Sequence, residues 1–176
     1  EYIKSSGAKR IVTTCPECAR TLGLDYPKLL GEHGMEVLHL SQFIHRRAAD
    51  SKLNWNLQKT QGTATYQDAC RLSRHLGVYE DPRALIVATG LNLVEMEHMR
   101  HTSLCCGTTG WTSCGRVSKN IQVQRLREAK ATGADLMVTS CVKCQIHLKC
   151  AQQDPDLHQD IAIKIRDLTT VLADRL

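Results

Sequence analysis

The sequence has few aromatic residues and no long apolar run. It contains one phenylalanine, and aromatic residues make up 4% of the 176 residues. Its most apolar stretch, Ala84-Leu85-Ile86-Val87-Ala88, is far shorter than the ~20 residues that a membrane-spanning helix needs. No pattern typical of a secretory signal peptide opens the chain. These absences predict no direct membrane span and favour a cytoplasmic protein, either free or peripheral to a membrane complex.

A concentrated basic surface is also missing from the sequence. The net charge of +5 results from 23 basic and 18 acidic residues that are spread along the chain. Proteins that bind nucleic acid typically combine clustered Lys and Arg with aromatic residues on which bases stack. The sequence shows no such interleaving, so we expect no nucleic-acid partner.

Cysteine, by contrast, is abundant, with nine residues in the chain. In a secreted domain an odd number would suggest a disulfide framework with a spare thiol. Here the Cys-x-x-Cys pairs lie within segments that alternate between strand and helix patterns, and no secretion signal is visible. The cysteine content therefore indicates a reducing compartment and metal–thiolate chemistry.

An internal repeat organises the chain. Residues 6–18 (SGAKRIVTTCPEC) align without a gap with residues 132–144 (TGADLMVTSCVKC). Each copy contains Gly-Ala, a short β-branched run, a hydroxyl pair and Cys-x-x-Cys. The repeat predicts a duplicated unit in which a buried strand leads through the cysteines into a helix.

Alternating patterns along the rest of the chain predict an α/β fold with short parallel sheets flanked by helices. Strands are expected at 10–14, 35–40, 63–67, 91–96, 136–139 and 161–165. We expect helices from Pro16 to Gly34, from a Ser41 cap to residue 50, and over 81–89, 118–131 and 168–176, with another after Cys141. A helix beginning at Ala69 would place Cys70 in its first turn, where the helix dipole favours a thiolate.

Two adjacent cysteines followed by glycine, Cys105-Cys106-Gly107, are difficult to explain as packed core residues. Neighbouring side chains diverge on a helix or strand, and a disulfide between adjacent cysteines would be strained. An inorganic core that both sulfurs reach from one side fits this turn. The glycine would let backbone N–H groups approach that core closely.

Five cysteines share a regular spacing: Cys70, then 34 residues, Cys105-Cys106, then 34 residues, Cys141-x-x-Cys144. Each is expected after a strand or at the start of a helix, so a parallel sheet would bring all five to one edge. Five thiolates exceed the four ligands of a tetrahedral zinc, whereas an iron–sulfur core can use them. A structural zinc that uses four of them, or a scatter of buried thiols, remains an alternative.

The cysteines, together with segments 65–70 (TYQDAC), 76–79 (LGVY), 81–83 (DPR) and 93–96 (LVEM), resemble the Cys-Cys-Gly (CCG, cysteine-rich) domains. These domains occur in heterodisulfide reductase B and D subunits and in iron–sulfur subunits of glycolate and lactate oxidation systems. One departure is Gln67-Asp68-Ala69-Cys70, where the family usually has His-Asp-Pro-Cys. The resemblance implies duplicated CCG units: the carboxyl-terminal part of a first unit over 1–58 and a complete second unit over 59–176.

The resemblance also implies a cofactor and its ligands. The metal ligands of the second unit would be Cys70, Cys105, Cys106, Cys141 and Cys144, holding a non-cubane [4Fe–4S] cluster. Cys15 and Cys18 would be the last two ligands of the first unit, holding a second cluster or zinc. Gly107 and Gly110 would present backbone N–H groups to the cluster. Cys114 and Cys150 are expected to be packed or half-exposed thiols, and Arg83 to lie on a solvated face.

The function implied by the resemblance is that of an electron-transfer or catalytic subunit of a heterodisulfide-reductase-like oxidoreductase. Such a subunit reduces a disulfide or relays electrons, with a ferredoxin-type or flavin-bearing partner subunit as donor and a thiol or disulfide as substrate. One alternative is a non-catalytic zinc- or cluster-binding module that docks a larger complex. Another is thiol–disulfide exchange by Cys15 and Cys18, whose spacing suits it. No catalytic residue can be assigned from the sequence.

Overall fold

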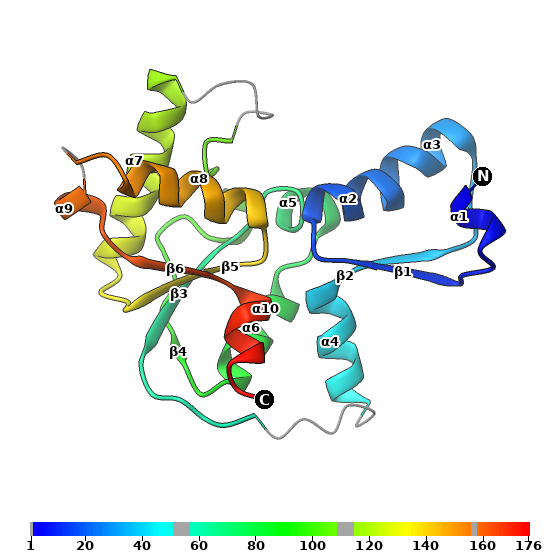
Figure 1. Ribbon diagram of the computed structural model, residues 1–176, viewed down its shortest axis with the longest axis horizontal. Coiled ribbons are helices and arrows are strands. Elements are labelled where there is room, and N and C mark those ends of the chain that lie inside the picture. Colours follow the sequence, from blue (N-terminus) through cyan, green and yellow to red (C-terminus); the bar gives the residue numbers. More distant parts are fainter. Residues whose placement is uncertain (1, 51–56, 109–114, 156–157) are drawn as a thin grey trace.

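Every paired strand in the described part of the chain runs parallel to its neighbour. The computed structural model describes residues 2–50, 57–108, 115–155 and 158–176 (Figure 1). In chain order the elements are α1 (Tyr2–Ser5), β1 (Arg10–Thr13), α2 (Pro16–Arg20), η1 (Thr21–Asp25), α3 (Tyr26–Leu30), β2 (Glu36–His39), α4 (Leu40–Ala49), β3 (Thr63–Gln67), α5 (Ser73–Leu76), α6 (Glu80–Ala88), β4 (Asn92–Leu93), η2 (Arg100–Thr102), α7 (Arg116–Ala131), β5 (Leu136–Thr139), α8 (Val142–Gln152), α9 (His158–Ile161), β6 (Lys164–Asp167) and α10 (Leu168–Ala173). The predicted α/β class is confirmed.

The strands form two sheets. β1 and β2 pair in a small sheet within residues 1–58, and the second sheet has the order β4-β3-β5-β6. The register pairs Tyr66 with Val138 and Gln67 with Thr139, so β3 and β5 end side by side. The loops that follow these two strands therefore leave the same edge of the sheet.

Helices cover both faces of the four-stranded sheet (Figure 1). One core lies under α7 and α8 and includes Met137, Leu126 and Leu148. The other lies under α6 and α10 and includes Tyr66 and Leu85. α4 packs against α6, which places the small sheet beside the larger one.

The two copies of the repeat adopt the same local structure. β1 leads through Cys15 into α2, and β5 leads through Cys141 into α8, with each cysteine at the position that caps its helix. Figure 1 shows the amino ends of α2 and α8 facing each other near the centre of the molecule. Pro16 occupies the first position of α2, where its missing N–H costs nothing.

Several predicted element boundaries were wrong. The first helical run, α2 through the π-helical η1 to α3, ends at Gly31 rather than Gly34, because Gly31 already supplies a φ of +77°. α4 is capped by His39 instead of Ser41, and the Gln42 side chain completes the capping box. The helix after β3 begins at Ser73, so Cys70 lies in a turn that precedes it.

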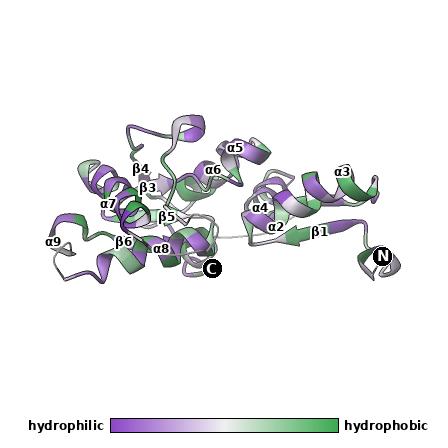
Figure 2. Cartoon of the chain, turned by 90° about the horizontal axis from the view of Figure 1, so that it is seen from above, coloured by the Kyte–Doolittle hydropathy of each residue, from purple (hydrophilic) through white to green (hydrophobic). Residues whose placement is uncertain are grey.

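Two strands also differ from their predicted ranges by more than one residue at an end. β4 has only two residues, because the chain leaves the sheet after Leu93 and Glu95 turns toward Arg83. The last strand is Lys164–Asp167 rather than 161–165, since Ile161 is fully buried at the end of α9. Apolar side chains remain exposed on the outer part of residues 1–58, notably Leu29 and Leu30 of α3. Figure 2 shows the hydrophobic residues on α3 in green. No helix in the described ranges is long and apolar enough to cross a membrane.

Candidate metal centre

Six cysteines line one cavity at the edge of the sheet where β3 and β5 end. The cavity has a volume of about 190 Å³. Its lining consists of Cys15, Pro16, Glu17, Ala69, Cys70, Arg71, Cys105, Cys106, Thr108, Cys141, Val142, Lys143 and Cys144. The five cysteines that the sequence pattern singles out are therefore brought together, and Cys15 of the small sheet faces the same space.

The five thiols reach the cavity from three local structures. Cys70 lies in the turn after β3, and Cys105 and Cys106 lie in the loop after η2. Cys141 caps α8, and Cys144 lies in its first turn. Cys106 and Cys144 are each 4% exposed, so solvent reaches these two sulfurs poorly. The helix dipole predicted at Cys70 is absent, because the four-residue α5 begins three residues later.

The thiols hydrogen-bond to one another in a chain that sets their acidity. Thiol donors at Cys106 and Cys70, with the N–H groups of Gly107 and Thr108, lower the pKa of Cys105 to about 2. A hydrogen bond to Cys105 raises the pKa of Cys106 to about 11. A hydrogen bond to Cys105 and burial together raise the pKa of Cys70.

A second thiolate forms at the repeated motif. The Cys144 thiol and the N–H groups of Cys144 and Lys143 lower the pKa of Cys141 to about 7, although burial opposes the shift. Hydrogen bonding to Cys106 and Cys141, together with burial, raises the pKa of Cys144. Cys105 and Cys141 are thus favoured as thiolates, the form of cysteine that binds metal. The raised pKa values of Cys70, Cys106 and Cys144 mean that these three thiols keep their protons in the absence of a metal.

Gly107 is required where it stands in the Cys-Cys-Gly turn. Its φ is +78°, and a Cβ atom there would lie 2.7 Å from the carbonyl oxygen of Ser118. The Ser118 hydroxyl also donates to the Gly107 carbonyl. The turn is therefore held against α7 while the Gly107 N–H faces the Cys105 sulfur. Gly110, the other glycine of the predicted site, lies outside the described residues.

The two other cysteines of the described residues, Cys18 and Cys150, do not line the cavity. Cys18 is exposed, and its N–H donates to the Cys15 sulfur at 3.3 Å. The hydrogen bond with the Cys15 thiol raises the pKa of Cys18, which disfavours a role as an activated nucleophile. Cys150 is exposed on α8. Cys114 lies outside the described residues.

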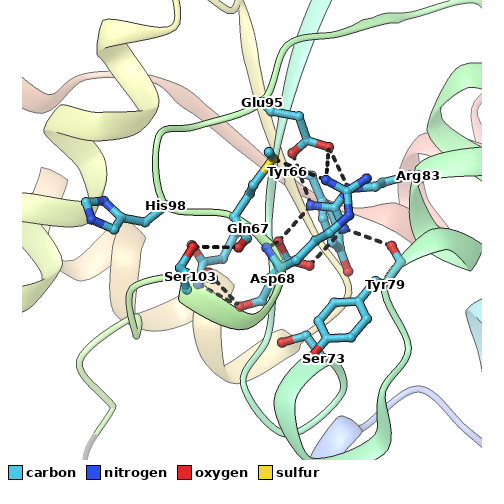
Figure 3. A network of polar contacts seen from close by, with 12 residues as sticks. Tyr66, Gln67, Asp68, Ser73, Tyr79, Arg83, Glu95, His98 and Ser103 are labelled. Carbon is cyan, nitrogen blue, oxygen red and sulfur yellow. Dashed lines mark hydrogen bonds and ion pairs between the residues drawn. The ribbon is translucent and has the colours of Figure 1, made fainter.

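A buried ionic network beneath the cavity was not predicted. Arg83 is 4% exposed rather than on a solvated face. It donates to both carboxylate oxygens of Asp68, at 2.9 and 2.8 Å, and to Glu95 at 2.6 Å (Figure 3). Its guanidinium also lies 5.1 Å from the centre of the Tyr66 ring. Because Asp68 is two residues before Cys70, this network fixes the turn that carries that thiol.

A second buried arginine contacts the loop that carries the adjacent cysteines. Arg125 of α7 is fully buried and pairs with Glu128 at 2.7 Å. It also donates to the Gln67 side chain, to the Ser103 hydroxyl at 3.1 Å and to the His98 carbonyl at 2.8 Å. The sequence signals neither arginine, because their partners lie up to 58 residues away along the chain.

Positive charge lies at the rim of the cavity. Arg71 and Lys143 both line it, and Lys143 pairs with Glu17 of α2.

Among the described residues, no three Cys, His, Asp or Glu side chains are arranged as ligands of a single metal ion. The thiols instead surround a space. About 10–15 Å³ of such space holds one water molecule, so the cavity has room for a group of several atoms.

A known protein family matches the part of the chain that carries these five thiols. Residues 64–149 match the family described as the cysteine-rich CCG domain. This segment of the chain belongs to the CCG family. The match contains Cys70, Cys105, Cys106, Cys141 and Cys144, and the resemblance predicted from the sequence motifs is confirmed.

Three curated relatives illustrate the range of proteins with similar chains. The D-type subunit of the dihydromethanophenazine:CoB–CoM heterodisulfide reductase of Methanosarcina acetivorans is 31% identical over the whole chain and 43% of its own length. The EtfAB:quinone oxidoreductase of Syntrophomonas wolfei is 31% identical over 82% of the chain and 21% of its own length. The B-type subunit of the fumarate reductase (CoM/CoB) of Methanothermobacter marburgensis is 32% identical over 81% of the chain and 28% of its own length. The chain thus spans less than half the length of each relative.

Proposed function

We propose that the chain is part of an iron–sulfur subunit of a heterodisulfide-reductase-like oxidoreductase. In this proposal one non-cubane [4Fe–4S] cluster is held by Cys70, Cys105, Cys106, Cys141 and Cys144. The observation that carries the proposal is the single cavity on which these five thiols converge. The names of the relatives add support, since they describe components of a heterodisulfide reductase and a fumarate reductase, and a quinone oxidoreductase.

The donor set fits an iron–sulfur core better than zinc. Thiolates are the usual ligands of iron–sulfur clusters, and five of them exceed a tetrahedral zinc site. The space between the sulfurs also suits a polyatomic core more than one ion. The N–H groups of Gly107 and Thr108 face the Cys105 sulfur, and such donors to cluster thiolates tune the reduction potential.

When bound, such a cluster supplies one-electron transfer and an iron to which a substrate sulfur can bind. The chain's own residues would hold the thiolates, limit water access through burial of Cys106 and Cys144, and present Arg71 and Lys143 at the rim. We propose a thiol or disulfide substrate, or electron relay to a further partner. The electron donor would be a ferredoxin-type or flavin-bearing partner subunit.

We further propose that residues 1–58 are the carboxyl-terminal part of one CCG unit and residues 59–176 a second unit. Support comes from the separate sheets in the two ranges and from the matching strand–Cys–helix structure of both repeats. Cys15 and Cys18 would contribute to a second cluster or a zinc site. Two thiols complete neither, so a metal there needs further ligands.

Metal analysis of anaerobically purified protein tests the proposal. Iron, acid-labile sulfide and zinc are measured per chain in the parent, in Cys106→Ser and in Cys150→Ser. The last variant is the matched control, because Cys150 is exposed and does not line the cavity. We expect near-equal iron and sulfide in the parent and the control, and loss of both in Cys106→Ser.

The alternative function predicts a different composition. A non-catalytic zinc module that docks a larger complex would contain zinc without sulfide, and that result would overturn the electron-transfer proposal. Iron and sulfide that persist in Cys106→Ser would show that Cys106 is not required to hold the cluster. Disulfide-reduction and electron-transfer assays with reduced ferredoxin or flavin donors then distinguish the two proposed reactions.

A further inference from the structure

The side-chain amide of Gln67 links the two loops that carry Cys70 and Cys105. Gln67 is the last residue of β3 and is 1% exposed. Its amide nitrogen donates to the carbonyl of Asp68 at 3.1 Å and to the carbonyl of Leu104 at 3.2 Å. The second carbonyl belongs to the peptide that joins Leu104 to Cys105, and the first lies one residue before the Ala69–Cys70 peptide.

The orientation of this amide is fixed by its other neighbour. The Nε–H of Arg125 donates to the amide oxygen of Gln67. A guanidinium can only donate hydrogen bonds, so the amide oxygen must face Arg125 and the NH₂ group must face the two carbonyls. The pairing of Arg125 with Glu128 holds the guanidinium in place. Figure 3 shows Gln67 beside Asp68 and Ser103.

No other side chain among the described residues links both carbonyls as completely. The Ser103 hydroxyl lies 3.4 Å from the Asp68 carbonyl and 3.3 Å from the Leu104 carbonyl. Its single proton serves one of them at a time, whereas the two protons of the Gln67 amide serve both. Gln67 therefore sets the separation of the two loops, with Ser103 as a weaker second link.

We propose that Gln67 is a positioning residue that sets the separation of Cys70 and Cys105, and that Arg125 fixes the orientation of its amide. The inference rests on the proposed cluster site, because it assigns the spacing of two of its five thiols to one side chain. Residues that orient metal ligands commonly change metal affinity or activity about ten- to hundredfold when they are replaced.

Substitutions at Gln67 separate this role from simple packing. Gln67→Glu keeps the shape and an acceptor for Arg125 but turns an oxygen toward the two carbonyls. Gln67→Met keeps the volume and removes every hydrogen bond. Gln67→His retains one ring donor and one ring acceptor, and Gln67→Asn keeps the amide on a shorter stem. Thr65→Val is the matched control, since Thr65 is fully buried on the same strand and its hydroxyl has no hydrogen-bond partner in the described part of the chain.

The experiment uses the full chain, anaerobically loaded with iron and sulfide. It measures iron release to a chelator, the electron paramagnetic resonance spectrum, the midpoint potential and the unfolding temperature. For the Glu and Met variants we expect iron release about ten- to hundredfold faster, with an altered spectrum and potential. The His variant, which keeps one donor for the two carbonyls, should lie between the parent and the Met variant, and Thr65→Val should match the parent in all four measurements.

Several outcomes overturn the inference. Glu and Met variants that release iron at the parent's rate with the parent's spectrum would show that Gln67 does not set the loop separation. If those two variants fail to fold, Gln67→Asn decides, because it preserves polarity but cannot reach Arg125 and both carbonyls together. Parent-like iron release in Gln67→Asn would then overturn the inference. A parent that binds neither iron nor sulfide would instead overturn the proposed function itself.

Discussion

Glu17 and Lys143 form an ion pair between the first turns of α2 and α8. The two residues occupy equivalent positions of the internal repeat, each directly before the second cysteine of a Cys-x-x-Cys motif. The pair therefore joins the two repeats across the wall of the thiol-lined cavity. Opposite charges at equivalent positions allow the duplicated turns to face each other without repulsion.

This ion pair should contribute little to stability. The Glu17 and Lys143 side chains are 38% and 26% exposed, and the hydrogen bond from Lys143 lowers the pKa of Glu17. In a double-mutant cycle of Glu17→Gln and Lys143→Gln, we expect a favourable coupling below about 1 kcal/mol. Urea unfolding at low and high salt measures it, and salt should weaken it. A coupling well above 2 kcal/mol (about twice the exposed-pair range) would show that the pair is effectively buried.

The buried Arg83–Asp68 pair should behave differently. Its side chains are 5% and 0% exposed, and the two carboxylate oxygens of Asp68 both accept from the guanidinium. Arg83→Met leaves the Asp68 charge buried without this partner, so we expect a loss of about 3–5 kcal/mol in the free energy of unfolding. Arg83→Lys should recover only part of it, because an ammonium cannot bind both oxygens in the same fork geometry.

A matched control for this prediction is Arg127→Met. Arg127 pairs with Asp160, and both side chains are more than half exposed. The same substitution should therefore cost less than about 1 kcal/mol there. Equal losses at Arg83 and Arg127 in urea unfolding would contradict the assignment of Arg83 as a buried structural cation.

Burial of His39 predicts a dependence of stability on pH. His39 is 1% exposed, and burial lowers its pKa below the ordinary value of about 6.5. Its Nδ1 accepts from the Ser41 N–H, and its Nε2 contacts the Thr14 carbonyl, so the neutral ring caps α4. As the pH falls, His39 of the unfolded chain therefore binds a proton before His39 of the folded chain does. The stabilising contribution of His39 is thus complete above pH ~6.5 and is lost as the pH falls through the folded-state pKa.

Unfolding measured between about pH 7.5 and about pH 5.5 tests this prediction. The parent's free energy of unfolding should decrease toward the acid side, with His39 contributing up to about 1.4 kcal/mol per pH unit. His75 and His147 also have lowered pKa values and add to the parent's slope. His39→Asn, which keeps a residue able to cap a helix, should show a smaller slope. An unchanged slope would mean that the pKa of His39 is the same in the folded and the unfolded chain, which would contradict the prediction.

The sequence predicted the strand–Cys–helix units well, because they depend on local patterns. The β-branched run, the hydroxyl pair and Cys-x-x-Cys place Cys15 and Cys141 at helix starts, as the structure has them. The regular spacing of the other cysteines likewise anticipated their approach at one edge of the sheet.

Features that depend on tertiary contacts were not predictable in this way. The charges of Arg83 and Arg125 suggest surface positions, and only their partners Asp68, Glu95 and Glu128 make burial favourable. The start of α5 was misplaced because Asp68, a suitable cap by its residue type, is committed to Arg83 instead. Helix-capping propensity depends only on the local sequence, so it cannot predict that Asp68 binds Arg83 instead of capping a helix.

Gly107→Ala should affect the site more than an ordinary glycine substitution does. The φ of +78° already disfavours alanine, and the added Cβ would meet the Ser118 carbonyl at 2.7 Å and the Gln122 side chain at 3.2 Å. We expect a loss of about 1–3 kcal/mol in the free energy of unfolding and reduced iron retention, because the turn must move away from α7. Gly77→Ala is the control, since its φ is +69° but no atom of the described residues lies within 4 Å of the added Cβ. It should lose about 1 kcal/mol from the backbone alone and retain iron like the parent. If both variants retain iron equally, the close approach of Gly107 to α7 does not position the cysteine turn.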